Sequence, residues 1–187
     1  LELEFEKMFK VLILPRIRGK TGGAKKRYAG LLRKDGKEQI TVTGMELVRR
    51  DWTDLAKEFQ MELLKRVFHK KEVSQYIKDT IKNVRQGKFD HKLVYRKSIR
   101  KDLDEYTKTT PPHVKAARKL PQLRSNIITY LITVNGPEPI EKQESDIDYE
   151  HYIDKQLRPI AQTILELYNV DFDELMSGTS QKSLFDY

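Results

Sequence analysis

The sequence predicts an α+β protein, with short antiparallel strands at its N-terminal end and a mainly helical part after them that contains a small β element. Two observations lead to this fold class: strand signals around an Asp35-Gly36 turn, and helical spacing of apolar residues after Asp51. The β-branched stretch "NIITYLITV" predicts a buried strand within the helical part.

The N-terminal residues carry the strand signals. The stretch "LELEFE" alternates apolar and acidic residues, which is typical of a strand with one face in water. Downstream, "KKRYAGLL" and "EQITVTG" flank "RKDGK", and the Asp-Gly pair is a strong hairpin signal because glycine tolerates positive φ. Residues 1–48 are therefore expected to form a small antiparallel sheet.

A basic cluster lies at the start of the first hairpin strand. Residues 25–28 are expected to belong to that strand, where alternation divides them between its two faces. Lys26 and Tyr28 are then expected on one face, and Lys25 and Arg27 on the other.

Helices are expected after Asp51, and either Asp51 or Thr53 caps the first of them. A second helix is expected over residues 72–86, ending at Gly87, and a short one within "TTPPHVKAARKL". "GPEP" predicts a turn, and a long helix follows over residues 149–168, with Pro159 starting a new turn or a kink. The apolar stripe of the first helix is Leu55, Phe59, Leu63 and Val67, widened by Trp52, Ala56, Leu64 and Phe68.

Composition limits the class of protein. The 187 residues suffice for one medium domain, or for part of a larger fold and one domain. No apolar stretch approaches the roughly 20 residues of a membrane span, so no membrane partner is expected. Cysteine is absent, which excludes disulfides and thiolate metal sites and fits a reducing compartment. Because the chain starts at Leu1 within a strand-like stretch, we expect it to be a fragment.

The positive charge is concentrated in one part of the chain. Residues 1–120 hold 31 Lys or Arg against 16 Asp or Glu, whereas residues 121–187 hold 5 against 12. Nine basic residues and one acid fall within residues 16–37 alone. A basic body followed by an acidic end indicates a polyanionic partner, such as a nucleic acid, for the first part only.

No catalytic centre stands out. Two-metal phosphoryl chemistry needs carboxylates that converge on one point, and two acidic clusters could supply them: Asp146 with Asp148, and Asp171 with Asp173 and Glu174. Both clusters directly precede expected helices, where acids favour the helix dipole. The four histidines are dispersed without ligand spacing. The chain is therefore expected to be inactive alone.

Two further segments combine cations with aromatic residues. The stretch "LVYRKSIRKDLDEY" places Tyr95 beside Arg96, Lys97, Arg100 and Lys101. The stretch "PPHVKAARK" adds four more basic side chains: His113, Lys115, Arg118 and Lys119. Interleaved Lys, Arg and Tyr are typical of a surface that follows a phosphate backbone.

The C-terminal stretch "SGTSQKSLFDY" is polar until it ends in Leu184, Phe185 and Tyr187. Exposed apolar residues at a polar terminus favour docking into a groove of a partner, although the terminus could also fold back onto its own domain.

Taken in order, several segments resemble the C-terminal part of family B DNA polymerases, of the DNA polymerase II type. They are "KKRYAGLL", "GMELVRRDW", "LVYRKSIRKDLDEY", "PPHVKAARK", "TVNGPEP" and "DYEHYIDKQLRPI". The resemblance implies that residues 1–50 are the last palm strands, 51–176 the thumb and 177–187 a flexible tail. One departure is the loop at residues 121–124, which is shorter than the glycine-containing loop expected there.

The resemblance also implies roles for individual residues. Lys26 and Tyr28 match motif residues that face primer–template DNA, while Lys25 and Arg27 would pair with protein acids or distant phosphates. Thumb residues along the duplex backbone would be Tyr95, Arg96, Lys97, Arg100, His113 and Lys115. In the tail, "QKSLF" resembles a clamp-binding peptide, in which Gln181 would hydrogen-bond and Leu184 and Phe185 would fill an apolar pocket.

The intact parent would use two divalent metal ions, expected to be Mg²⁺, held by aspartates that precede Leu1. Its expected partners are primer–template DNA, a sliding clamp whose type the sequence leaves open, and the rest of the polymerase chain. Its expected location is the cytoplasm, at the nucleoid. Two alternatives remain. One is a non-enzymatic basic nucleic-acid-binding module with an acidic protein-interaction end, and the other is a metal-dependent phosphotransferase that uses Asp146 and Asp148.

Overall fold

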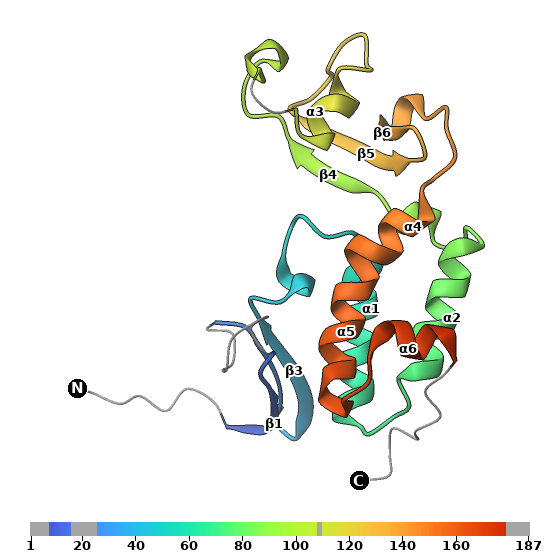
Figure 1. The fold of residues 1–187 in the computed structure, drawn as a ribbon. Helices are drawn as coiled ribbons and strands as arrows, with labels where there is room; N and C mark the ends of the chain where they lie inside the picture. Colours follow the sequence, from blue (N-terminus) through green and yellow to red (C-terminus); the bar gives the residue numbers. More distant parts are fainter. Residues whose placement is uncertain (1–7, 16–25, 108–109, 179–187) are drawn as a thin grey trace. The chain divides into compact units, whose positions relative to one another are not determined.

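The computed structural model describes residues 8–15, 26–107 and 110–178, and its elements confirm the α+β class (Figure 1). Two antiparallel three-stranded sheets occur among these residues, in the orders β1-β2-β3 and β4-β5-β6. The strand expected over residues 1–6 lies outside the described residues.

The first sheet is built on the predicted hairpin. β2 (Tyr28–Lys34) pairs with β3 (Lys37–Thr43) in antiparallel register. Asp35 and Gly36 connect the strands with φ of 53° and 77°. Positive φ at both central residues is what an Asp-Gly turn supplies, so the hairpin prediction is confirmed.

The alternation pattern does not predict β1 (Phe9–Ile13), which pairs with β2. The Phe9 ring lies over Gly30, where an added Cβ would stand 2.3 Å from the Phe9 Cδ1 atom. Only glycine at position 30 therefore leaves room for this ring. The ring also meets that of Tyr28 edge to face, with 5.9 Å between the centroids.

Two helices occupy the ranges that helical spacing predicts: α1 (Asp54–Phe68) and α2 (Ser74–Arg85). Thr53 caps α1, because its Oγ1 accepts a hydrogen bond of 3.3 Å from the N–H of Ala56. Gly87 follows α2 with φ of 72°, as expected of a glycine that ends a helix. The predicted apolar positions that are fully buried include Phe59, Leu63, Leu64, Val73, Ile77, Ile81 and Val84.

The second sheet carries the later basic segments. It consists of β4 (Tyr95–Ser98), β5 (Ile127–Thr133) and β6 (Gly136–Pro139). The short helix α3 (Pro112–Ala117) begins with proline, as predicted. The small apolar core that α3 and β5 share contains Ala116, Ala117, Ile128 and Tyr130.

The existence of β6 corrects the turn predicted for "GPEP". Of these four residues, only Gly136 has a positive φ, of 93°. Pro137 and Pro139 stand in a strand that, in the described part of the chain, pairs only with β5, opposite Ile132 and Tyr130. An edge strand tolerates proline because the missing N–H groups can face away from the ladder. Glycine and proline usually indicate a turn, but here their residues form a strand because they pair with β5.

The long helix predicted over residues 149–168 is continuous but not uniform. It runs through α4 (Tyr149–Tyr152), a π-helical turn (Ile153–Leu157) and α5 (Arg158–Leu165). Pro159 has no N–H group to donate to a carbonyl in the preceding turn. The helix accommodates this missing hydrogen bond with the wider π turn just before Pro159. The predicted irregularity at Pro159 is thus present as a π turn.

A further helix, α6 (Phe172–Ser177), follows the long one. Short 3-10 helices occupy Glu46–Val48, Asp90–Lys92, Leu103–Glu105, Ile140–Lys142 and Glu166–Tyr168.

The chain divides into two compact units. One contains Leu1–Arg49, Lys57–Lys78 and Ile160–Tyr187, and the other contains Arg50–Ala56 and Asp79–Pro159. The first sheet and α6 belong to the first unit, and the second sheet and α3 belong to the second. The domain division expected from the resemblance, with boundaries after residues 50 and 176, stays a prediction.

Candidate nucleic-acid interface

Lys26 is the first described residue of the basic cluster, and it lies outside the strand. Its φ is 61°, it is exposed, and β2 begins only at Tyr28. The predicted alternation over residues 25–28 is therefore wrong at Lys26 and Arg27, because a left-handed turn interrupts the extended backbone before β2. Lys25 lies outside the described residues.

The turn is held against the end of β3. Gly44 has φ of 63°, and a Cβ added there would stand 2.1 Å from the carbonyl oxygen of Lys26. Two backbone segments can approach this closely only because position 44 has no side chain. Tyr28 follows in β2 opposite Thr43 and is half-buried.

The Arg27 side chain turns to its own chain. Its Nη2 atom forms an ion pair with Oε1 of Glu46. The Glu46 carboxylate also accepts a hydrogen bond of 2.7 Å from Gln60 Nε2, and Gln60 Oε1 accepts one of 2.6 Å from the Leu47 N–H. Of the two partners expected for Arg27, the structure provides the protein acid.

Glu46 and Gln60 belong to this site although no sequence motif indicates them. Both are buried, with 9% and 1% of their surface exposed. One feature of the sequence could have indicated Glu46: it is an acid between the apolar residues Met45 and Leu47 in "GMELV". A charged residue in an apolar stretch is buried only when it is paired, so this position predicts a buried ion pair.

In the second unit, Tyr95 anchors β4. Its ring stacks on those of Tyr130 and Tyr152, at 5.3 and 5.6 Å between centroids. Its hydroxyl lies 3.3 Å from Nε2 of His151. Burial raises the pKa of the Tyr95 phenol, and the two neighbouring tyrosines raise it further. Tyr95 therefore packs within the protein, unlike the basic residues that follow it.

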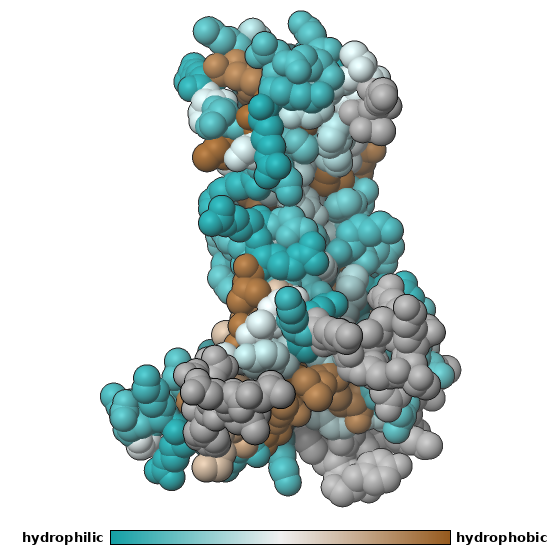
Figure 2. All heavy atoms as spheres, turned by 90° about the vertical axis from the view of Figure 1, so that its left-hand side faces the viewer, coloured by the Kyte–Doolittle hydropathy of each residue, from teal (hydrophilic) through white to brown (hydrophobic). Residues whose placement is uncertain are grey.

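The cations that follow Tyr95 are exposed. Arg96 has 67% of its side chain exposed and lies 3.9 Å from a carboxylate oxygen of Asp54, which is itself 54% exposed. An ion pair so open to water contributes little stability. Lys97 and Arg100 are also exposed. In the upper part of Figure 2, which holds β4–β6 and α3, hydrophilic residues predominate on the visible face.

Helix α3 adds the next basic side chains. Lys115 is exposed and His113 is half-buried. Burial lowers the pKa of His113, and the positive charge of Lys97 lowers it further. The structure therefore brings Lys97 of β4 and His113 of α3 into the same neighbourhood.

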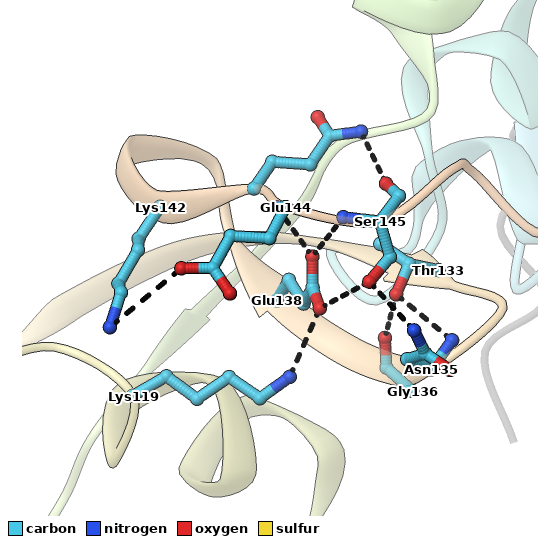
Figure 3. A network of polar contacts seen from close by, with 9 residues as sticks. Lys119, Thr133, Asn135, Gly136, Glu138, Lys142, Glu144 and Ser145 are labelled. Atoms are coloured by element: carbon cyan, nitrogen blue, oxygen red, sulfur yellow. Dashed lines mark hydrogen bonds and ion pairs between the residues drawn. The ribbon is translucent and has the colours of Figure 1, made fainter.

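Three other cations of these segments have structural partners. Lys101 donates to the Glu105 carbonyl at 2.9 Å, and Arg118 donates to the Leu103 carbonyl at 2.8 Å. Lys119 lies 3.2 Å from Oε1 of the buried Glu138. Figure 3 shows this carboxylate between Lys119 and the turn that contains Ser145.

One acid of each acidic cluster caps a helix. Asp148 accepts a hydrogen bond of 3.0 Å from the His151 N–H at the start of α4. Asp171 accepts bonds of 2.8 and 3.3 Å from the Asp173 and Glu174 N–H groups at the start of α6. These contacts agree with the expectation that the acids favour helix N-termini. Among the described residues, no three His, Asp or Glu side chains form a metal-ligand group.

The clamp-binding prediction concerns the C-terminal tail. Gln181, Leu184 and Phe185 lie outside the described residues, so their role stays a prediction. None of the helices in the described part of the chain has the length and apolar character needed to cross a membrane.

Comparison with known proteins identifies the family. Residues 1–167 match the family model of DNA polymerase family B. The matched range includes both sheets and every helix through α5, so the chain belongs to this family. The resemblance stated from the sequence motifs is thereby confirmed.

Individual relatives give the same result. DNA polymerase II of Escherichia coli (strain K12) is 43% identical over 95% of this chain, and a DNA polymerase of Methanocaldococcus jannaschii is 35% identical over 98%. The family B DNA polymerase of Pyrobaculum calidifontis has a similar structure, with a TM-score of 0.67, 30% identity and 90% of this chain covered. The chain spans 24%, 12% and 23% of these three proteins, which is about a quarter of their length or less.

Proposed function

We propose that this chain is the part of a DNA-directed DNA polymerase that grips the primer–template duplex. Residues 1–50 would complete the palm and residues 51–176 would form the thumb. The observation that carries the proposal is the exposed set of Arg96, Lys97 and Arg100 in a chain of this family. Arg96 makes only a solvent-exposed ion pair with Asp54, at 3.9 Å, and all three residues are exposed.

In this proposal, the thumb residues contact phosphates. Arg96, Lys97, Arg100, His113 and Lys115 would follow the duplex backbone, where each neutralised phosphate releases counterions. Such contacts fix position on the duplex without reading its sequence. Tyr95 would act indirectly, because its ring is packed against Tyr130 and Tyr152.

The residues at the start of β2 would contact the minor groove. An ammonium and a phenol can donate hydrogen bonds to acceptors that all base pairs present there. Lys26, which is exposed, and Tyr28, which is half-buried, supply these two groups. They would sense the shape of the last base pairs rather than their identity. Lys25 would add to the positive charge of this surface.

The parent enzyme would add nucleotides from dNTPs to a primer terminus with two Mg²⁺ ions. The described residues do not fit such a metal site, since Asp148 and Asp171 are engaged as helix caps. The proposed task of this chain is to hold the duplex, and the nucleotidyl transfer would belong to the rest of the parent.

The tail would tether the polymerase to a sliding clamp. Gln181 would hydrogen-bond to the clamp, and Leu184 and Phe185 would enter an apolar pocket. Tethering raises the effective concentration of DNA at the enzyme without new DNA contacts. The parent would act at the nucleoid, in replication or repair.

The test is the affinity of the chain for a labelled primer–template duplex across a salt series, with single-stranded DNA measured beside it. The double variant Arg96→Ala/Lys97→Ala should reduce the salt slope by roughly two phosphate contacts, at about 0.9 per contact. The matched control is Lys34→Ala/Lys37→Ala at the exposed hairpin tip, which removes the same charge and should leave the slope unchanged.

We expect the chain to bind the primer–template duplex more tightly than single-stranded DNA. Equal affinity for both, together with unchanged slopes in both double variants, would mean that Arg96 and Lys97 are ordinary surface charge and would overturn the DNA-contact assignments.

A further inference from the structure

A polar network connects the basic turn to helix α1. It starts at the Arg27 guanidinium, passes through the Glu46 carboxylate and reaches Gln60, whose amide oxygen accepts from the Leu47 N–H. All of these residues belong to the first compact unit. The network therefore fixes the residue directly after Lys26 to the helix.

The backbone on the other side of Arg27 is also restrained. The Lys26 carbonyl lies against Gly44, and both residues have left-handed φ, 61° and 63°. A lysine with positive φ costs energy, so the surrounding contacts must hold it there. Lys26 thus stands between two anchors, the close approach of Gly44 and the side chain of Arg27.

Glu46 carries a negative charge, which DNA binding alone would not favour. Its carboxylate lies beside a basic segment, where a negative charge lowers the attraction for phosphates. It is nevertheless buried, and two hydrogen-bond donors are directed at it. Its contribution must therefore come from the geometry it imposes on Arg27.

We propose that Arg27, Glu46 and Gln60 are positioning residues that hold Lys26 and Tyr28 ready for the minor groove. Arg27 acts on the DNA through Lys26 and Tyr28, not by direct contact. This inference rests on the proposed function. Holding the turn before DNA arrives removes part of the ordering cost of binding.

The sign of one substitution tests the proposal. Glu46→Gln keeps the size of the side chain but removes a negative charge, so electrostatics alone predicts tighter duplex binding. Positioning predicts the opposite, a loss of about fivefold, which corresponds to one well-placed hydrogen bond. The readout is the dissociation constant for the primer–template duplex at one fixed salt concentration.

The matched control is Glu62→Gln. Glu62 also pairs with an arginine in the first unit, Arg66, at 2.9 Å, but on the surface of α1. The same charge is removed, and duplex affinity should stay the same or rise slightly. Thermal unfolding of each variant shows whether it is folded at the temperature of the binding assay.

Lys26→Ala separates this inference from the proposed function. It should weaken duplex binding about fivefold, and adding Glu46→Gln to it should cause a smaller further loss than Glu46→Gln causes alone, because the part of its effect that acts through Lys26 is already gone. If Lys26→Ala binds as tightly as the unmodified chain, the proposed minor-groove role fails and the positioning role with it. If Lys26→Ala weakens binding but Glu46→Gln does not, only the positioning role is overturned.

A second variant covers the case in which Glu46→Gln does not fold. Arg27→Lys keeps the positive charge, so a purely electrostatic role predicts unchanged affinity. Positioning predicts weaker binding, because the lysine ammonium lies one bond short of the position of Arg27 Nη2, the atom that contacts the Glu46 carboxylate. Unchanged binding by a folded Arg27→Lys variant would overturn the proposal.

Discussion

The ring of Tyr95 stacks on the ring of Tyr130, with 5.3 Å between centroids and 20° between planes. The two residues lie directly opposite each other in β4 and β5. Tyr152 from the long helix stacks on Tyr95 as well, at 5.6 Å. This aromatic contact anchors the strand that presents Arg96 and Lys97, so the first residue of the basic segment contributes by packing.

Substitution of Tyr95 should separate packing from DNA contact. Tyr95→Ala removes the ring from the stack and should lower the free energy of unfolding by about 3 kcal/mol, as measured in urea. Tyr95→Phe keeps the ring and loses only the hydroxyl near His151, so the cost should be about 1 kcal/mol or less. Duplex affinity of Tyr95→Phe should be unchanged, and a clear loss would show that the phenol contacts DNA.

Glu138 should stabilise the second unit through its charge. Hydrogen bonds from the Glu144 and Ser145 N–H groups, together with the nearby Lys119, lower its pKa to about 2 although burial opposes this. Glu138→Gln should therefore cost about 2 kcal/mol of unfolding free energy at neutral pH. The same substitution at the exposed Glu144, next to it in the network of Figure 3, should change stability by about 0.5 kcal/mol or less.

The pH dependence of this contribution follows from the direction of the shift. The folded-state pKa of Glu138 lies below its ordinary value of 4.5, so the stabilisation is fully present above that pH. It is lost as the pH falls from 4.5 through about 2. The difference in stability between the unmodified chain and Glu138→Gln should therefore shrink as the pH is lowered from 4.5. A constant difference would contradict the low pKa.

Gly44 and Gly36 should respond differently to the same substitution. Both have positive φ, 63° and 77°, but a Cβ at Gly44 would stand 2.1 Å from a backbone oxygen, whereas a Cβ at Gly36 meets open space. Gly36→Ala should cost about 1 kcal/mol from backbone strain alone. Gly44→Ala adds a clash with Lys26 and should cost clearly more in the same thermal unfolding assay. If both substitutions lowered the free energy of unfolding equally, the turn at Lys26 would be able to move away from the new Cβ of residue 44 without cost.

The pKa of His113 should report on its neighbours. Burial is the larger cause of its lowered pKa and Lys97 the smaller, so Lys97→Ala should raise the pKa only in part, as followed by NMR titration of the ring protons. A bound phosphate favours the protonated imidazole, so duplex DNA should raise the same pKa and bind more tightly as the pH falls through it. Exposed Lys115, on the same helix, is the control, and Lys115→Ala should leave the His113 pKa nearly unchanged.

The sequence by itself determined the features that depend on neighbouring residues. An Asp35-Gly36 pair accepts positive φ, apolar residues at helical spacing produce α1 and α2, and proline begins α3. Family membership was also readable, because the order of short motifs along the chain carries it.

Only the tertiary structure decided how the candidate interface is built. The turn at Lys26 depends on Gly44, the pairing of Arg27 on Glu46, and the packing of Tyr95 on Tyr152, which lies far along the chain. The strand β6 likewise forms because its backbone pairs with β5, although its own residues favour a turn. A local pattern cannot specify these contacts, since each stabilises its conformation only after distant segments have come together.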